Sequence, residues 1–227
     1  MKKIMFNDKF GLTQAVLEGR KTQTRRVITY PKTFHGKDVC GYYVCRRATD
    51  RAITEVCMYD ENESFIDEGQ ILPKYKVGEV VAVAQSYKTL GYNYYALDIS
   101  PKDFHISRGI LGKSKGWNNK MFVRAEACKH QIRITNVHIE RLQDISDECC
   151  LKEGVMKWDA GQKDIPFFCY PNSARCDYDT PQEAFAHLIN KVSRKDVWQE
   201  NPYVFVYDFE LVTHTILKST QVTTITQ

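Results

Sequence analysis

Hydrophobic and polar residues alternate with a period of two along several short stretches of the chain, which is the pattern of β-strands. In residues 203–212 aromatic side chains occupy every second position from Tyr203 to Phe209, and the positions between them change from apolar to acidic. Residues 132–139 also alternate, but the phase shifts at 135–136, as it does at a β-bulge or a bent barrel corner. Further strands are predicted over residues 2–6, 41–46, 53–59, 79–87 and 121–127.

Three segments carry the signals of helix ends. Asp8 can cap a helix that ends at Gly19, and Ser146 can cap a helix that ends at Gly154. The third helix begins at Thr180, with proline at the first helical position, an acid three residues after the cap and an apolar stripe behind it. These helices are short, and they separate groups of strands.

The strands and helices follow one another without a βαβ rhythm, which predicts a mixed α/β, β-rich fold. We expect a β-barrel with flanking helices, in a single domain over residues 1–227. Stretches rich in glycine, proline, lysine, aspartate and asparagine interrupt it, and we predict long loop insertions there, at about 28–73, 88–130 and 156–179.

Composition places the chain among ordinary globular proteins, with 43% hydrophobic and 26% charged residues. No run approaches 18 apolar residues and the N-terminus lacks a signal-peptide core, so we expect a cytoplasmic protein with no membrane partner. The eight cysteines include no Cys-x-x-Cys pair. Cys128 and His130 could share a strand face as metal ligands, but reduced, half-buried thiols are the commoner case. We predict no metal and no cofactor.

Basic charge is concentrated near the N-terminus. The net charge is +4, yet residues 1–50 carry eleven bases and four acids, whereas the remaining residues carry 21 bases and 24 acids. This distribution favours an anionic partner, with a nucleoside, a nucleotide or RNA as the leading class, although a solvated positive face is an equally ordinary explanation.

The densest polar segment is Gly19–Arg26, which follows the end of the first helix and contains four cations in seven residues. Neighbouring guanidinium groups disfavour a protonated Lys21, so its amine could act as a base. Thr24 could then act as a nucleophile, as in Ser/Thr–Lys catalysis. In an extended segment Lys21 points away from Thr24, so the chain must turn, or the lysine stem must curl, for the two to meet. The alternative is a solvated basic loop.

This segment, together with Met5-Phe6-Asn7, resembles the signature of the ASCH domain family, whose members have a PUA-like β-barrel. The most specific part is the string Gly19-Arg20-Lys21-Thr22-Gln23-Thr24-Arg25-Arg26. Further similar segments follow in the family's order and resemble its larger, phage- and prophage-type members. The similar segments cover under half of the chain and are residues 2–27, 74–87, 131–155 and 180–212.

The resemblance implies a function. ASCH domains are regarded as RNA-associated modules, and a small bacterial member hydrolyses the acetyl amide of 4-acetylcytidine. In that member the matching string supplies a lysine base and a threonine nucleophile, and a later glutamate donates a proton. The matching positions in this chain are Lys21, Thr24 and Glu153, which we therefore predict as catalytic residues.

The chain departs from the family after its central strand, where larger members have an Arg-Glu-x-Trp-like tail and this chain has Ala84-Gln85-Ser86-Tyr87. Gln85 could read a base edge and Tyr87 could stack on a base, or both could be ordinary wall residues. The other predicted ligand-binding residues are Arg20, Thr22, Arg25, Arg26, Asn201 and Tyr203.

Three hypotheses follow. The first is an amidohydrolase that acts on an acylated nucleoside such as 4-acetylcytidine. The second is a non-catalytic module that binds RNA or a modified nucleotide, and the third is a protein whose last helix and strand form a partner surface. The enzyme hypothesis requires the end groups of Lys21, Thr24 and Glu153 to converge on one cleft.

Overall fold

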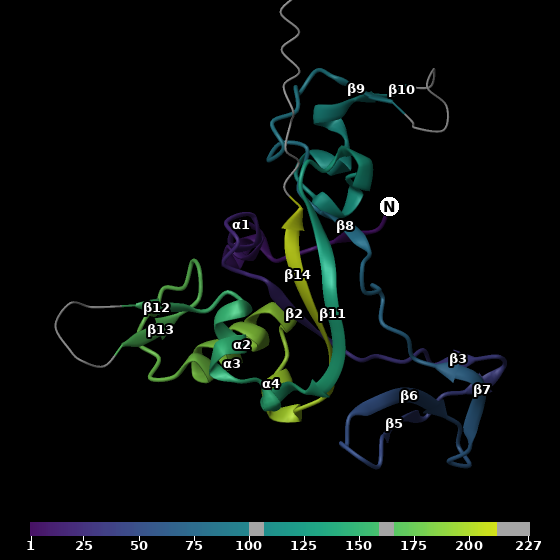
Figure 1. Cartoon of the computed structure of the whole chain (residues 1–227). Helices are drawn as coiled ribbons and strands as arrows, with labels where there is room; N and C mark the ends of the chain where they lie inside the picture. Colours follow the sequence, from purple (N-terminus) through teal and green to yellow (C-terminus); the bar gives the residue numbers. More distant parts are fainter. Residues whose placement is uncertain (100–106, 159–165, 213–227) are drawn as a thin grey trace, which may run out of the picture.

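A five-stranded sheet forms the centre of the protein in the computed structural model, which describes residues 1–99, 107–158 and 166–212 (Figure 1). Its strands lie in the order β1-β8-β11-β14-β2. Only β1 and β8 run parallel, and the other neighbours are antiparallel. The strands are β1 (Lys3–Ile4), β2 (Gln23–Val27), β8 (Val80–Val83), β11 (Gln131–Arg141) and β14 (Tyr203–Val212).

The long pair of β11 and β14 is the backbone of this sheet. It runs from the pairing of Gln131 with Val212 to that of Arg141 with Tyr203, and its register shifts between Ile134 and Asn136. This irregularity lies where the apolar alternation changes phase, so the predicted bulge is confirmed. The shift inverts the alternation of side chains along β11. Every second side chain therefore points to one face of the sheet before the shift, and the same series of positions points to the other face after it.

The α-helices of the described residues lie to one side of β14 and β11 in Figure 1, where α2, α3 and α4 are grouped together. The Ser146 hydroxyl accepts a hydrogen bond from the N–H of Cys149, and Thr180 caps its helix in the same way, so both predicted caps are confirmed. Asp8 is not a cap, because a 3-10 turn and Gly11, with φ of 62°, delay the first helix. The helices are α1 (Leu12–Leu17), α2 (Asp147–Lys152), α3 (Pro181–Ser193) and α4 (Val197–Glu200).

Small sheets occupy much of the segments that we predicted as insertions. A three-stranded sheet lies away from the helices in Figure 1. Among the described residues there are also three two-stranded sheets, of which β12-β13 lies beside the helices and β9-β10 lies at the opposite end of the molecule from the three-stranded sheet. Parts of the predicted insertions, residues 100–106 and 159–165, lie outside the described residues. The sheet contains β5 (Gly41–Arg46), β6 (Ile53–Tyr59) and β7 (Phe65–Gln70), and the hairpin strands are β3 (Thr33–Phe34), β4 (Lys37–Asp38), β9 (Leu97–Ile99), β10 (Ser107–Ile110), β12 (Met156–Trp158) and β13 (Phe167–Cys169).

The predicted strand over residues 121–127 is wrong. Two 3-10 turns, Lys120–Phe122 and Ala125–Ala127, take its place. The Asn119 side chain accepts a hydrogen bond from the N–H of Met121, which starts the first turn. Val123 and Ala125 pack into a small separate cluster with Leu90 and Leu111, whereas Met121 and Phe122 are exposed.

The main core lies between the central sheet and the helices and includes Val81, Ile132, Phe185 and Val206. A mixed, strand-rich fold is therefore confirmed. In the described ranges the central sheet is open, with β1 and β2 at its edges, and no closed barrel is found. The two edges nevertheless lie close together. The guanidinium of Arg26, on β2, donates a hydrogen bond of 2.7 Å to the carbonyl oxygen of Met5, which directly follows β1.

No helix among the described residues is both long enough and apolar enough to cross a membrane.

The cap of α3 gives a test of this fold. Replacing Thr180 by alanine removes the oxygen that accepts the N–H of Glu183 at 3.1 Å, and we expect the free energy of unfolding to fall by about 1 kcal/mol. Thr180→Ser keeps that oxygen and serves as the control in urea denaturation. Equal losses in the two variants would show that the cap does not stabilise the helix.

Candidate functional site

The C-terminal ends of α1 and α2 meet beside the start of β2. After α1 the chain turns at Gly19, and the N–H of Lys21 donates to the carbonyl oxygen of Ala15 at 3.0 Å. The N–H of Thr22 then donates to the carbonyl oxygen of Lys152 at 2.9 Å. Glu153 directly follows α2, so this backbone contact places Lys21 beside Glu153, although the two are far apart in sequence.

Lys21 and Glu153 form a buried ion pair. Only 2% of the surface of Lys21 and 5% of the surface of Glu153 are exposed. The Lys21 ammonium donates to a Glu153 carboxylate oxygen and, at 2.8 Å each, to the carbonyl oxygens of Gln23 and Glu153. Burial lowers the pKa of Lys21 below its usual value of 10.5, against the opposing attraction of Glu153. The solvated basic loop considered above is therefore not what forms around Lys21.

Arg25 is a second buried cation on the same carboxylate. Its guanidinium contacts Glu153 at 3.2 Å and Glu140 at 2.7 Å, and it donates to the side-chain oxygen of Gln23 at 2.6 Å. Burial favours the neutral form, but Glu153 and Glu140 outweigh it and hold the pKa of Arg25 above its usual range. Arg25 thus links two carboxylates, and its contacts within the protein account for its position.

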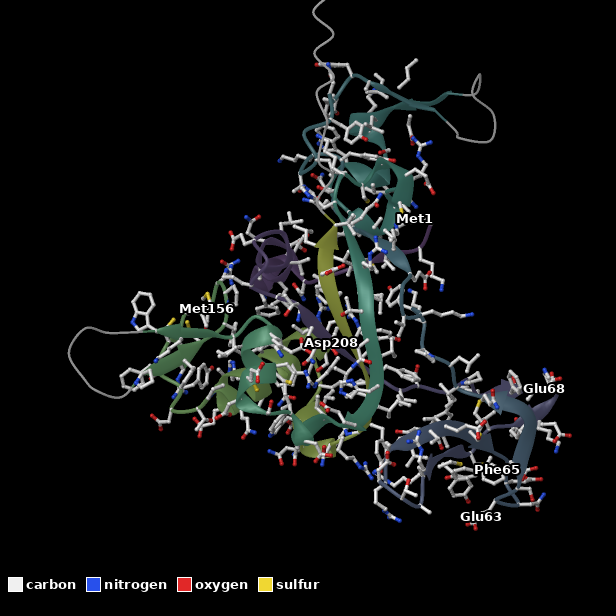
Figure 2. The ribbon with its side chains drawn as sticks, viewed as in Figure 1. Met1, Glu63, Phe65, Glu68, Met156 and Asp208 are labelled. Atoms are coloured by element: carbon white, nitrogen blue, oxygen red, sulfur yellow. The ribbon has the colours of Figure 1, made fainter. Side chains whose placement is uncertain are left out.

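The hydrogen bonds continue from Arg25 around one face of the sheet. Glu140 contacts His138 at 3.3 Å, and His138 and Asn136 are adjacent along the same face of β11. Asn136 donates to Asp208, labelled in the middle of the sheet in Figure 2, and Gln23 donates to the other oxygen of Asp208 at 2.6 Å. Since Gln23 also accepts from Arg25, the polar contacts form a closed ring.

This ring lowers the pKa of one of its members. Burial raises the pKa of the Glu140 carboxyl, but hydrogen bonds and charge from His138 and Arg25 outweigh burial and lower it. Our sequence interpretation missed Gln23, Glu140 and Asp208. The polar residues at every second position of β11 after the bulge were a signal for Glu140, but not for the residues on other strands with which it is connected.

Thr24 lies on β2 opposite Tyr207 and is buried. Together with Lys21 and Glu153 it lines a cavity of about 60 Å³. The structure therefore brings all three predicted catalytic residues to one place. None of the three hydrogen bonds donated by the Lys21 ammonium goes to Thr24.

The cavity is small for a ligand site, since pockets for small molecules have volumes of roughly 300–1,000 Å³. Its walls include Phe6 and Phe185, and the exposed residues Met5 and Arg26 mark its outer end. A volume of about 60 Å³ has room only for a group of a few atoms, so any larger ligand would extend beyond this cavity.

The other predicted residues of the basic segment lie apart from this cavity or at its edge. Arg20 is exposed, pairs with Glu18 at 2.5 Å, and lines a different cavity of about 560 Å³. The backbone of Thr22 joins the site to Lys152 and Phe209. Arg26 borders the cavity of Lys21.

Gln85 and Tyr87 take different places from those expected for one ligand pocket. Gln85 lines the cavity of about 560 Å³, and its side-chain oxygen is buried without a hydrogen-bond partner in the described part of the protein. Tyr87 is buried in the small apolar cluster, edge-on to Tyr92 and close against Gly116. Only 2% of Tyr87 is exposed, a position that matches the alternative of an ordinary wall residue, and base stacking by Tyr87 stays a prediction.

Asn201 and Tyr203 lie at the opposite end of β14 from the bulge and line none of the cavities described above. The Asn201 side chain accepts from the N–H of Gln143 at 2.9 Å. The Tyr203 ring lies under Arg141, with 3.9 Å from guanidinium carbon to ring centre, and its hydroxyl accepts from Arg46. Both residues join the sheet to neighbouring segments, and their predicted role in ligand binding stays a prediction.

Residues 1–99, 107–158 and 166–212 contain no group of three or more His, Cys, Asp or Glu residues that could hold a metal ion. Cys128, one of the two residues considered as ligands, is buried, and its thiol donates to the carbonyl oxygen of Arg124.

Comparison of the chain with protein-family models, with curated proteins and with solved structures finds no match.

The buried pair predicts a strong energetic coupling. Lys21→Met leaves a buried carboxylate with one cation fewer, and we expect a loss of roughly 3 kcal/mol in the free energy of unfolding. Lys21→Met combined with Glu153→Gln should lose less than the sum of the two single variants. Chemical denaturation of the full cycle measures this coupling.

Lys152→Met is the matched control, because Lys152 pairs with Glu148 on the exposed side of α2. Its effect should be much smaller. Similar losses for Lys21→Met and Lys152→Met would contradict a special role of burial.

Proposed function

We propose that the protein is an ASCH-type amidohydrolase with a PUA-like fold, which removes the acyl group from an acylated nucleoside such as 4-acetylcytidine. The observation that carries this proposal is the meeting of Lys21, Thr24 and Glu153 at one cavity. These three residues are the ones that the motif resemblance selected, and they come from two elements far apart in the chain. An amine, an alcohol and a carboxyl group in one place are the parts that such a reaction needs.

The ion pair can supply both a base and an acid. When the proton of the Lys21 ammonium moves to Glu153, the pair becomes an amine and a carboxylic acid. The amine takes the proton of Thr24 as its Oγ1 attacks the amide carbonyl carbon. The C–N bond then breaks, and Glu153 donates its proton to the leaving amine. The acyl group remains on Thr24 as an ester, and the pair is again an ammonium and a carboxylate.

Water completes the proposed cycle. Glu153 takes a proton from the attacking water, and the ester bond to Thr24 breaks. Lys21 returns a proton to the threonine oxygen, so the acyl group leaves as a carboxylic acid. Before the first step, the Lys21 amino group must give up one of its present hydrogen bonds and contact the Thr24 hydroxyl instead. Arg25, which contacts Glu153, is a positioning residue in this scheme.

A specific observation favours the alternative of a binding module. The three hydrogen bonds of the Lys21 ammonium and four of the Arg25 guanidinium all go to acceptors within the protein, so the two cations are satisfied without a ligand. In this alternative the pair only stabilises the fold, and the exposed Arg26 at the cavity's outer end would contact RNA or a modified nucleotide. Hydrolysis separates the two functions.

Thr24 provides the sharpest test. Thr24→Val keeps the shape of the side chain but removes the nucleophile, and we expect the hydrolysis of 4-acetylcytidine to fall by roughly a hundredfold or more. Thr24→Ser keeps a hydroxyl and should retain much of the activity, measured by release of cytidine. If purified wild type leaves a panel of acylated nucleosides intact, the enzyme proposal is abandoned in favour of binding.

The pH dependence of the reaction gives a second test. Above the pKa of Lys21 the pair has lost its last proton, so no acid remains for the leaving amine. Because burial lowers that pKa, kcat/KM should fall at alkaline pH with a midpoint below 10.5. Activity that holds to higher pH, after correction for uncatalysed hydrolysis, would exclude Lys21 from this role.

A further inference from the structure

A third cavity, of about 330 Å³, lies across the gap between the two edge strands of the central sheet. Lys3 belongs to β1 and Arg26 to β2, and both line it. Its floor includes the buried rings of Tyr75, Phe205 and Tyr207. We call it the edge cavity. Its volume falls within the range of small-molecule sites.

The edge cavity adjoins the cavity of Lys21, because Met5 and Arg26 line both. The exposed Arg26 side chain therefore stands between the place of the proposed chemistry and a larger open space. A substrate whose acyl end occupies the small cavity has the edge cavity as the nearest room for its remaining part.

The charged side chains that line the edge cavity are all positive. Its lining contains Lys3, Arg26 and Lys74 and no carboxylate. None of these three forms an ion pair with any residue in the described ranges, whereas the nearby Lys2 and Lys120 pair with Glu79 and Asp8. Neighbouring cations repel one another, and an anion in the cavity would relieve that repulsion.

The three cations differ in how freely they can reach a ligand. The Lys3 ammonium is held by the carbonyl oxygens of residues 120, 121 and 123. Arg26 uses one donor on Met5 and keeps others, and Lys74 is exposed, with its ammonium 5.5 Å from the centre of the Tyr75 ring. Arg26 and Lys74 can therefore donate to an anion directly, while Lys3 adds a fixed positive charge.

We propose that the edge cavity binds the phosphate and sugar of a phosphorylated nucleoside, so that the substrate is an acylated nucleotide rather than a free nucleoside. This inference rests on the proposed function. Arg26 and Lys74 hold the phosphate by charge-assisted hydrogen bonds, and the apolar floor lies against the sugar. Lys74 is then a specificity-determining residue that the motif did not indicate.

The test compares 4-acetylcytidine with its 5′-monophosphate as substrates of the full chain. We expect kcat/KM to be roughly tenfold or more higher for the nucleotide at low salt, and the advantage to shrink as salt is added. Lys74→Gln should reduce this advantage by roughly fivefold to tenfold. Lys88→Gln is the control, since Lys88 is exposed, forms no ion pair with described residues and lines neither cavity.

Binding measured without turnover separates this inference from the proposed function. Calorimetry with cytidine 5′-monophosphate and with cytidine should show tighter binding of the nucleotide, weakened in Lys74→Gln. If neither acylated compound is hydrolysed but this difference in binding persists, the edge cavity is supported as a phosphate-binding site and the amidohydrolase proposal fails.

Equal hydrolysis of the two substrates, with equal and salt-independent binding, overturns the inference and leaves the amidohydrolase. Preference for an RNA oligonucleotide over the monophosphate, with the same dependence on Lys74, overturns it as well and assigns the cavity to an RNA strand.

Discussion

The ammonium group of Lys21 is taken out of water, and the surrounding structure is arranged to compensate for that loss. An unpaired charge in such a place costs several kcal/mol, so the fold must bring a carboxylate and two carbonyl oxygens to it. Glu153 reaches Lys21 only because α2 ends where α1 ends. Arg25 then pairs with Glu153, and Glu140 pairs with Arg25. The ring on the sheet face extends this compensation across three strands.

This requirement explains why the helices and the sheet are joined so closely at one point. The backbone contact from Thr22 to Lys152 fixes the ends of the two helices, and Phe209 donates to the carbonyl oxygen of the same Thr22. A side chain of ordinary length can then span from β2 to α2 in a buried setting. The acidic end of the pair lies at the C-terminus of a helix, where a carboxylate gains nothing from the helix dipole, so its stabilisation depends on Lys21 and Arg25.

Local patterns predicted the parts of the fold that depend on local physics. The bounds of β5, β6 and β14, the caps at Ser146 and Thr180, and the bulge in β11 follow from alternation and side-chain chemistry within a few residues. The strand predicted over 121–127 was wrong because a short apolar run packs equally well in consecutive turns. For the site, the motif indicated Lys21, Thr24 and Glu153, but the partners Glu140 and Asp208 depend on which strands pair and in which register. That information is not local.

The open edges of the central sheet connect its architecture with its charge. Where two edge strands face each other without pairing, their side chains rather than their backbones determine what lies between them. Here β1 and β2 contribute Lys3 and Arg26, and the backbone of Met5 is held by the second of these. If β1 and β2 were paired by backbone hydrogen bonds, their main chains would occupy this space. Leaving the edges apart instead creates a positively charged cavity next to the buried pair of Lys21 and Glu153. We propose that this adjacency makes the pair part of a site for an anionic substrate, rather than an ion pair that only stabilises the fold.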